Sequence, residues 1–260
     1  MKIWQKSELV SQLKALGIKQ GSVLFVHSSL RSLGHVEGGA ETVVNALLET
    51  LGPDGTLLMP GFQSGSEYIF ASSGICFDAG NTPSECGYLT EYFRNLPSVI
   101  RSLSPTHSIS GLGPMAEKLL SGHECCNVTA GWGSPFQKII EADGKILMLG
   151  VSRESNTMMH FLENTGGAPT VCATEFATKV ITPEGKEIIT RIYPHFPGLH
   201  RNYTKAIELL DQAGGLVSGQ VGNASCELYP VRLLRDVVYE ELEHDPCAFI
   251  KIFTPGKIDE

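Results

Sequence analysis

The sequence predicts an α/β protein with a central, mostly parallel sheet flanked by helices and a smaller, irregular α+β region. Three observations predict this fold. Short apolar segments, typical of strands, alternate along the chain with longer amphipathic segments, typical of helices. The apolar segments are continuous rather than alternating, which indicates a sheet covered on both faces. The 260 residues contain no internal repeat or obvious linker, so we expect one domain over residues 1–260.

The first predicted elements form a strand–helix–strand unit. Apolar spacing predicts a helix over residues 7–16, opened by Ser7, and "SVLFVHSSL" predicts a buried strand from Ser22 to Val26. The segment "GGAETVVNALLETLG" predicts a second helix with Gly52 at its C-terminus, and "GTLLMPGF" predicts the next buried strand. This order is that of a βαβ unit with two parallel strands.

The remaining chain has one irregular region. Residues 63–88 are rich in Gly, Ser, Pro and Cys and have no sustained period, so we expect an extended loop region over the core. The later predicted elements are helices over 88–97 and 113–122, a strand over 144–151, a hairpin over 174–194 that turns at Pro183–Gly185, a helix over 202–215, and a helix from Val231 that ends before Pro246.

Composition limits the function classes. A hydrophobic content of 42% and a charged content of 18% are typical of a soluble globular protein. The formal net charge of −8 argues against a nucleic-acid partner and suits a cationic small molecule. We find no signal peptide and no apolar run long enough to span a membrane, so we expect a cytoplasmic protein without a membrane partner. The seven cysteines follow no CxxC pattern and are expected to be reduced thiols.

Three polar stretches, at residues 27–39, 104–113 and 152–164, are the candidates for chemistry. In open α/β sheets, ligands bind beyond the carboxyl ends of the strands, and we expect the three stretches to meet there. The first lies between a strand and a helix and offers backbone amides for a phosphate, although it lacks a dinucleotide or P-loop spacing, and an ordinary βα loop is the simpler interpretation. The second contains His107 among small residues, where a structural hydrogen bond is the commoner role.

The third stretch places His160 and Glu163 three residues apart on one face of a short helix, with Ser155 or Asn156 as its N-cap. A carboxylate beside an imidazole raises its basicity, favours one tautomer and stabilises the imidazolium, so the pair is suited to proton transfer. A partly exposed His–Glu pair on a helix surface is the slightly simpler interpretation of the spacing alone.

Other candidate sites are weaker. His123, Cys125 and Cys126 offer zinc-ligand types without a workable spacing, and we expect no metal. Asp78, Glu85 and Glu91 offer negative charge for a cation, although solvated surface positions account for them as well.

Four segments together resemble the aminoglycoside N(3)-acetyltransferases, which are antibiotic N-acetyltransferases unrelated in fold to the common N-acetyltransferase superfamily. They follow the order and spacing of that family over roughly residues 5–165. The segments are "VHSSLRSLGHVEGGAETVVNALLETLGPDGTLLMPGF", "FDAGNTPSECGYLTEYFR", "RSLSPTHSISGLG" and "SPFQKIIEADGKILMLGVSRESNTMMHFLE".

The resemblance implies transfer of an acetyl group from acetyl-CoA to the 3-amino group of a 2-deoxystreptamine aminoglycoside, an antibiotic-resistance activity. It implies His160 as the catalytic histidine and Glu163 as the adjacent acid. The residues that it implies for contact with CoA are Ser28, Ser29, Leu30, Arg31, Val36, Glu37, Gly38, Gly39, Thr106, His107 and Ser108. One departure stands out: the region "IYPHFPGLHRNY", after the hairpin, contains His195 and His200 but no carboxylate, where relatives tend to have an acid.

The mechanistic hypothesis is direct transfer in a ternary complex, with His160 as general base and with His107 and backbone amides stabilising the oxyanion. Two alternatives remain open. One is an acetyl-CoA-dependent acyltransferase for a different small amine, and the other is a non-catalytic CoA-binding module. The expected partners are acetyl-CoA and a cationic amine, and a homodimer is left open.

Overall fold

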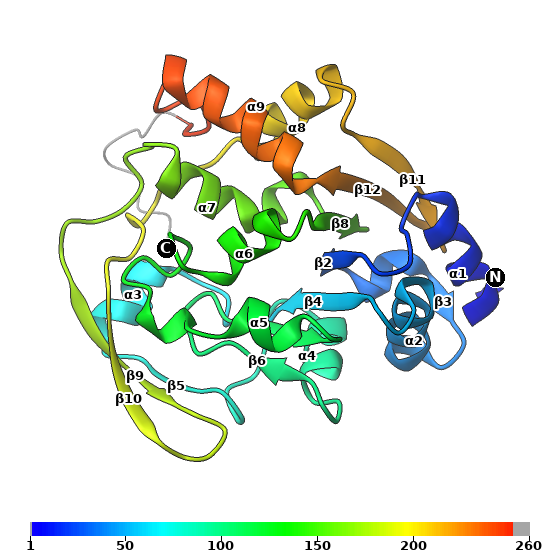
Figure 1. Cartoon of the computed structure of the whole chain (residues 1–260), viewed down its shortest axis with the longest axis horizontal. Coiled ribbons are helices and arrows are strands. Elements are labelled where there is room, and N and C mark those ends of the chain that lie inside the picture. Colours follow the sequence, from blue (N-terminus) through cyan, green and yellow to red (C-terminus); the bar gives the residue numbers. More distant parts are fainter. Residues whose placement is uncertain (1, 252–260) are drawn as a thin grey trace.

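The structure is a computed structural model that describes residues 2–251 (Figure 1). The strands are β1 (Ile3–Trp4), β2 (Val23–Ser28), β3 (His35–Val36), β4 (Thr56–Pro60), β5 (Cys76–Asp78), β6 (Ile100–Arg101), β7 (Ile109–Leu112), β8 (Lys145–Leu149), β9 (Phe176–Ile181), β10 (Glu187–Ile192), β11 (Val217–Val221) and β12 (Ala224–Pro230). The α-helices are α1 (Lys6–Ala15), α2 (Gly39–Leu51), α3 (Glu67–Ser72), α4 (Tyr88–Arg94), α5 (Ala116–Leu120), α6 (Pro135–Glu141), α7 (Met158–Thr165), α8 (Tyr203–Gln212) and α9 (Val231–His244). Short 3-10 helices are η1 (Leu30–Leu33), η2 (His123–Cys125) and η3 (Arg153–Ser155).

A seven-stranded sheet lies at the centre, in the order β11-β12-β8-β2-β4-β7-β6. The predicted α/β fold with a central sheet and flanking helices is confirmed, but the sheet is mixed, since only two of its six strand pairings are parallel. The parallel pairs are β8–β2 and β2–β4, whereas the outer strands pair antiparallel. At one edge of the sheet a hairpin explains the antiparallel pairing, because the two-residue connection Gly222–Asn223 between β11 and β12 is too short for a parallel crossover.

The sheet is buried on both faces, which explains the continuous apolar strands. In β2, Leu24 and Val26 belong to a core with helices α1, α2 and α4, whereas Phe25 belongs to a second core with helices α5 to α9. Successive side chains of a strand point to opposite faces, so residues 23–26 of β2 are all apolar because both faces are covered there. The strand ends with two buried polar residues, His27 and Ser28.

The helix boundaries mostly follow the predictions. Gly52 terminates α2, with φ of +67° and its N–H donating to Leu48 O at 2.9 Å. The prediction that Ser7 opens the first helix is wrong. Helix α1 begins at Lys6, and the carboxylate of Glu8 accepts a hydrogen bond from the N–H of Gln5 at 3.0 Å, so the capping interaction lies two residues earlier.

The prediction of an extended loop over residues 63–88 is wrong for two segments. Helix α3 is only six residues long, too short to show a helical period in the sequence. Strand β5 has three residues and pairs in parallel with β9, which lies about 100 positions later, to complete a small sheet in the order β10-β9-β5. Local sequence shows neither, because a distant partner stabilises β5 and burial stabilises α3.

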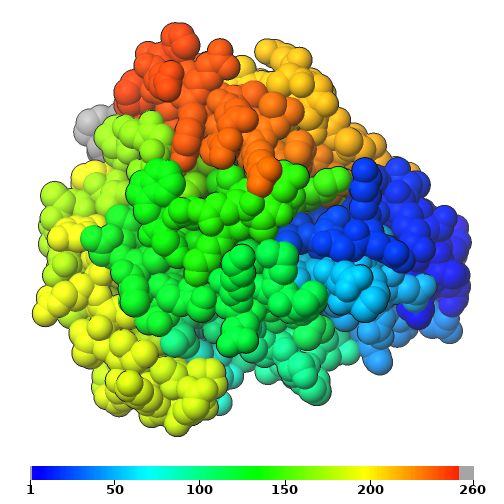
Figure 2. Space-filling model, in the orientation of Figure 1, coloured from blue at the N-terminus to red at the C-terminus, as the bar shows by residue number. Residues whose placement is uncertain are grey.

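The outer segments, the cysteines and the helix lengths complete the description of the fold. Figure 2 shows the β9–β10 hairpin (yellow) and the N-terminal segment (blue) at opposite sides of the molecule, with α9 (orange-red) along one edge. All seven cysteines are unpaired thiols, as predicted. Across residues 2–251, no helix has the length and apolar character that crossing a membrane requires.

Candidate active site

A cavity of about 270 Å³ opens beyond the carboxyl ends of the central strands and is lined from the segments 62–70, 106–107, 157–160 and 195–201. Strand β7 is antiparallel to β4, so the residues that precede β7 lie at the same edge of the sheet as the carboxyl ends of the parallel strands β4, β2 and β8. This brings His107 and His160 into one cavity, as the sequence predicts.

A second cavity, of about 250 Å³, adjoins the first and shares Phe62 and Thr157 with it. Ser28, from the first predicted stretch, lines this cavity, and its buried hydroxyl has no hydrogen-bond partner among residues 2–251. A buried polar atom without a partner is costly, so the hydroxyl is available to a ligand.

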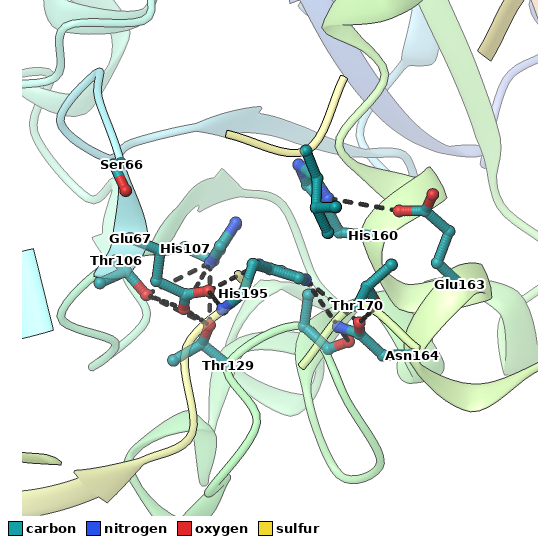
Figure 3. Close-up of polar contacts among 12 residues, drawn as sticks. Ser66, Glu67, Thr106, His107, Thr129, His160, Glu163, Asn164, Thr170 and His195 are labelled. Atoms are coloured by element: carbon teal, nitrogen blue, oxygen red, sulfur yellow. Dashed lines mark hydrogen bonds and ion pairs between the residues drawn. The ribbon is translucent and has the colours of Figure 1, made fainter. Parts of the chain in front are cut away.

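His160 and Glu163 lie on the same side of α7 (Figure 3). The hydroxyl of Tyr203 contacts both of them. The Tyr203 hydroxyl is 3.0 Å from His160 Nδ1 and donates to Glu163 Oε2 at 3.0 Å, whereas the imidazole and the carboxylate are 3.8 Å apart. While Glu163 is ionised, the hydroxyl hydrogen goes to its carboxylate, so the phenol oxygen accepts from His160 Nδ1–H. Nε2 of His160 then holds a lone pair on the cavity side, where no residue among 2–251 bonds it.

Burial sets the protonation of this group. Burial lowers the pKa of His160 well below its usual value, and the neighbouring His195 and His107 lower it further, so the imidazole is neutral at pH 7. Burial raises the pKa of Glu163 to about 7, although Arg201 and the Tyr203 hydrogen bond oppose the shift. Arg201 Nε lies 3.3 Å from Glu163 Oε2.

A second carboxylate, Glu67, lies at the centre of a buried cluster (Figure 3). Its Oε1 accepts hydrogen bonds from the hydroxyls of Thr106 at 2.7 Å and Thr129 at 2.5 Å and lies 3.3 Å from His107 Nδ1. Its Oε2 is 2.6 Å from His195 Nδ1 and accepts from His195 N–H at 2.8 Å. Burial by itself raises the pKa of Glu67, but His195 and His107 lower it well below its usual value.

Glu67 supplies the carboxylate that the segment around His195 lacks. The carboxylate beside this segment comes from α3, 128 positions earlier in the chain. Within residues 2–251, Glu67, His107 and His195 are also the one group of three close enough to hold a metal ion. Threonine hydroxyls and N–H groups already surround both oxygens of Glu67, which is a hydrogen-bonded arrangement. The absence of a metal stays a prediction.

The other predicted site residues lie elsewhere. Ser108 is fully buried, donates to Gly61 O at 2.8 Å and accepts from Arg101, so its hydroxyl is already bonded within the fold. Ser29 Oγ accepts from Ser32. The predicted CoA contacts of the first stretch that line neither cavity, between the end of β2 and the start of α2, are Ser29, Leu30, Arg31, Val36, Glu37, Gly38 and Gly39.

The fold and the site agree with the comparison to known proteins. A family model described as aminoglycoside 3-N-acetyltransferase matches residues 25–243. The chain belongs to this family. It is 31% identical to aminoglycoside N(3)-acetyltransferase IV of Salmonella over 253 residues, which cover 95% of this chain and 90% of that protein. The family's members are acyltransferases, and this chain is an enzyme of that class.

Two solved structures of the family extend the similarity to three dimensions. The apoenzyme of aminoglycoside acetyltransferase AAC(3)-IVa superposes with a TM-score of 0.81 at 28% identity, covering 98% of this chain and 93% of that one. The enzyme AAC-IIIb, solved as a binary complex with CoASH, superposes with a TM-score of 0.82 at 25% identity, covering 94% of this chain and 97% of that one. The family resemblance read from the sequence is thereby confirmed.

Sequence reasoning missed three residues of the site: Glu67, Tyr203 and Arg201. Glu67 is a lone acid in a short apolar segment. Tyr203 is the first residue of α8 and Arg201 lies just before it, outside the segments that resemble the family most. No local pattern marks them, because their partners lie between 38 and 128 positions away. The histidine-rich segment around His195 was the available signal.

Proposed function

We propose that this protein transfers the acetyl group of acetyl-CoA to the 3-amino group of a 2-deoxystreptamine aminoglycoside, and so confers resistance to the antibiotic. The observation that supports it is the His160–Tyr203–Glu163 relay, which presents Nε2 of a neutral imidazole to the cavity. A neutral imidazole with one nitrogen held by a carboxylate-linked partner has a lone pair for general-base catalysis, although the lowered pKa of His160 makes this lone pair less basic than that of a free imidazole.

Acetyl-CoA binding is proposed for the second cavity. The free hydroxyl of Ser28 and the apolar side chain of Phe62 suit an amide-containing, partly apolar chain such as pantetheine. The shared Phe62 and Thr157 connect that cavity to the one with His160, which allows the thioester to reach the acceptor amine. Glu85, bound to the rim residue Ser64, supplies negative charge for a cationic acceptor.

In the proposed reaction, His160 Nε2 removes a proton from the acceptor nitrogen as it attacks the thioester carbonyl. Tyr203 and Glu163 stabilise the imidazolium that forms, because the hydrogen bond from Nδ1–H to the phenol strengthens with the positive charge. A positioned general base contributes on the order of 10²–10⁴ in rate, and holding both substrates in one cavity contributes a further share.

The test is release of free CoA thiol with gentamicin and sisomicin as acceptors, for the wild type and for His160→Ala. We expect turnover to fall by about 100-fold or more, with little change in acetyl-CoA affinity. His200→Gln, at an exposed histidine outside both cavities, serves as the matched control. Near-normal turnover in His160→Ala would exclude it as the base.

One observation favours a second candidate function, acetyl transfer to a different small amine. Both buried carboxylates of the site are already paired, Glu67 with His107 and His195, and Glu163 with Arg201. A polycationic antibiotic needs several unpaired carboxylates to balance its charge, whereas a simple amine needs only one, so this pairing favours the simple amine. A panel of aminoglycosides and aliphatic polyamines separates the two, since each predicts turnover on a different half of the panel. Tight acetyl-CoA binding without turnover on any amine would instead indicate a non-catalytic module.

A further inference from the structure

A second imidazole faces the cavity. His107, in the segment just before β7, and His160, on α7, line the same cavity with their ring centroids 5.4 Å apart (Figure 3). Every hydrogen bond that His107 makes from its ring, within the part of the chain that the structure describes, involves Nδ1. Its Nε2 therefore has no partner there, as is also true of His160 Nε2.

Geometry decides which nitrogen of His107 holds the hydrogen. Nδ1 lies 2.8 Å from Thr129 Oγ1 and 3.2 Å from Thr106 Oγ1, and both hydroxyls donate their hydrogens to Glu67. With those hydrogens committed, the two threonine oxygens only accept, and the Glu67 carboxylate also only accepts. Nδ1 must therefore be the donor, so whenever the ring is neutral its lone pair lies on Nε2.

The third imidazole of the cluster differs in one respect. His195 bonds Glu67 through Nδ1 at 2.6 Å, while its Nε2 lies 3.0 and 3.1 Å from the amide atoms of Asn164. Both ring nitrogens are occupied, so His195 has no lone pair to offer a substrate. Of the two imidazoles bound to Glu67, only His107 has a nitrogen free to face the cavity.

The proposed reaction needs two proton acceptors. An aliphatic amine is an ammonium ion near neutral pH, so it loses one proton before it has a lone pair and a second after the nitrogen has bonded to carbon. We propose that His107 is a second catalytic base, which takes the first of these protons, and that Glu67 is the positioning residue that holds it in the required tautomer. This inference rests on the proposed acetyl transfer.

Nε2 of His107 takes a proton from the ammonium, leaving a neutral amine. The amine nitrogen bonds to the thioester carbonyl carbon, His160 takes the second proton, and the C–S bond breaks. The departing thiolate takes the proton of His160, and His107 releases its proton to solvent. One ammonium and one thioester thus give one amide, one thiol and one proton. While protonated, His107 Nε2–H is also able to donate to the oxyanion.

Two substitutions of His107 remove the base with and without the donor at the Nδ1 position. In His107→Asn, the side-chain amide still donates near the Nδ1 position, so the bond to the Glu67 cluster is retained and the Nε2 lone pair is lost. In His107→Gln, the donor at the Nδ1 position is lost as well, so a greater loss of thermal stability is expected for this variant than for His107→Asn. We expect His107→Asn to lower kcat by about 100-fold at pH 7, while thermal stability and acetyl-CoA binding stay close to those of the wild type. His200→Gln is again the control.

The pH dependence of kcat distinguishes a catalytic role of His107 from a purely structural one. The groups that face His107 are Glu67 from α3, His160 from α7, His195 after β10 and the buried His123 of η2, with Arg201 next to His160. The neutral fraction of the acceptor increases by about tenfold per pH unit below the amine's pKa. The deficit of His107→Asn relative to the wild type should therefore shrink between pH 7 and pH 9, whereas that of His160→Ala should persist.

A spectroscopic measurement tests the tautomer without turnover. Long-range ¹H–¹⁵N spectra of the wild type should show His107 with a protonated Nδ1 and an unprotonated Nε2, and Glu67→Gln should alter this pattern and lower kcat. An Nε2–H tautomer in the wild type, or a His107→Asn variant with wild-type kcat at pH 7, overturns the inference. Absence of wild-type turnover on every amine contradicts the proposed function instead, and the tautomer result remains separately interpretable.

Discussion

The bridging hydroxyl of Tyr203 is the most direct test of the active-site geometry. Tyr203→Phe removes one oxygen that contacts both His160 Nδ1 and Glu163 Oε2 at 3.0 Å, and leaves the apolar packing of the ring in place. A hydrogen bond to a charged group is worth about 1.5–3 kcal/mol. If the imidazolium of the transition state loses this support, kcat should fall by about 10- to 160-fold.

Steady-state thiol release gives the measurement. KM for acetyl-CoA should change little, because Tyr203 lines neither cavity. Tyr239→Phe is the matched control, since the Tyr239 hydroxyl contacts Thr165 Oγ1 at 2.6 Å on the same helix α7, outside both cavities. A Tyr203→Phe enzyme with kcat within about threefold of the wild type, less than the effect of one such hydrogen bond, would refute the relay.

Two further predictions concern stability. Burial lowers the pKa values of His27 and His123 to about 3 in the folded state, against about 6.5 in an unfolded chain, so below pH 6.5 the unfolded state binds more protons. The free energy of unfolding, measured with urea, should fall by up to about 1.4 kcal/mol per imidazole and pH unit from pH 6.5 toward pH 3, and a flat profile would contradict the neutral burial. A Cβ on Gly113 (φ +128°) would lie 2.3 Å from Gly55 O, whereas one on Gly122 (φ +73°) meets nothing within 4 Å. Gly113→Ala should therefore lose about 2–3 kcal/mol more than Gly122→Ala, and equal urea midpoints would show that the close approach is absent.

Regular elements with a strong local pattern were predictable. Strands β2, β4 and β8 are continuous apolar runs, and helix α2 has a clear period and a terminal glycine, so each is visible without tertiary information. Helix α3 and strand β5 were not predictable, since neither is long enough to show a period and β5 depends on a partner strand from a distant segment.

Some residues of the site were also predictable from the sequence, whereas their arrangement was not. His160 and Glu163 were identifiable because their spacing within a helix is a local property, and His107 because it lies in a recognisable motif. Their actual arrangement was not predictable. Spacing predicts that the imidazole and the carboxylate share a helix face, but the hydroxyl between them comes from α8, and the side-chain directions depend on how α7 and α8 pack.

The family, the α/β class and the candidate catalytic histidine follow from the amino-acid order alone, because they depend on local periodicity and on motifs in a set order. The folded arrangement was needed to show that Glu67 supplies the carboxylate missing beside His195, and which nitrogen of each imidazole faces the cavity. A tautomer depends on the donors and acceptors around a ring, and folding brings these from segments far apart in the chain.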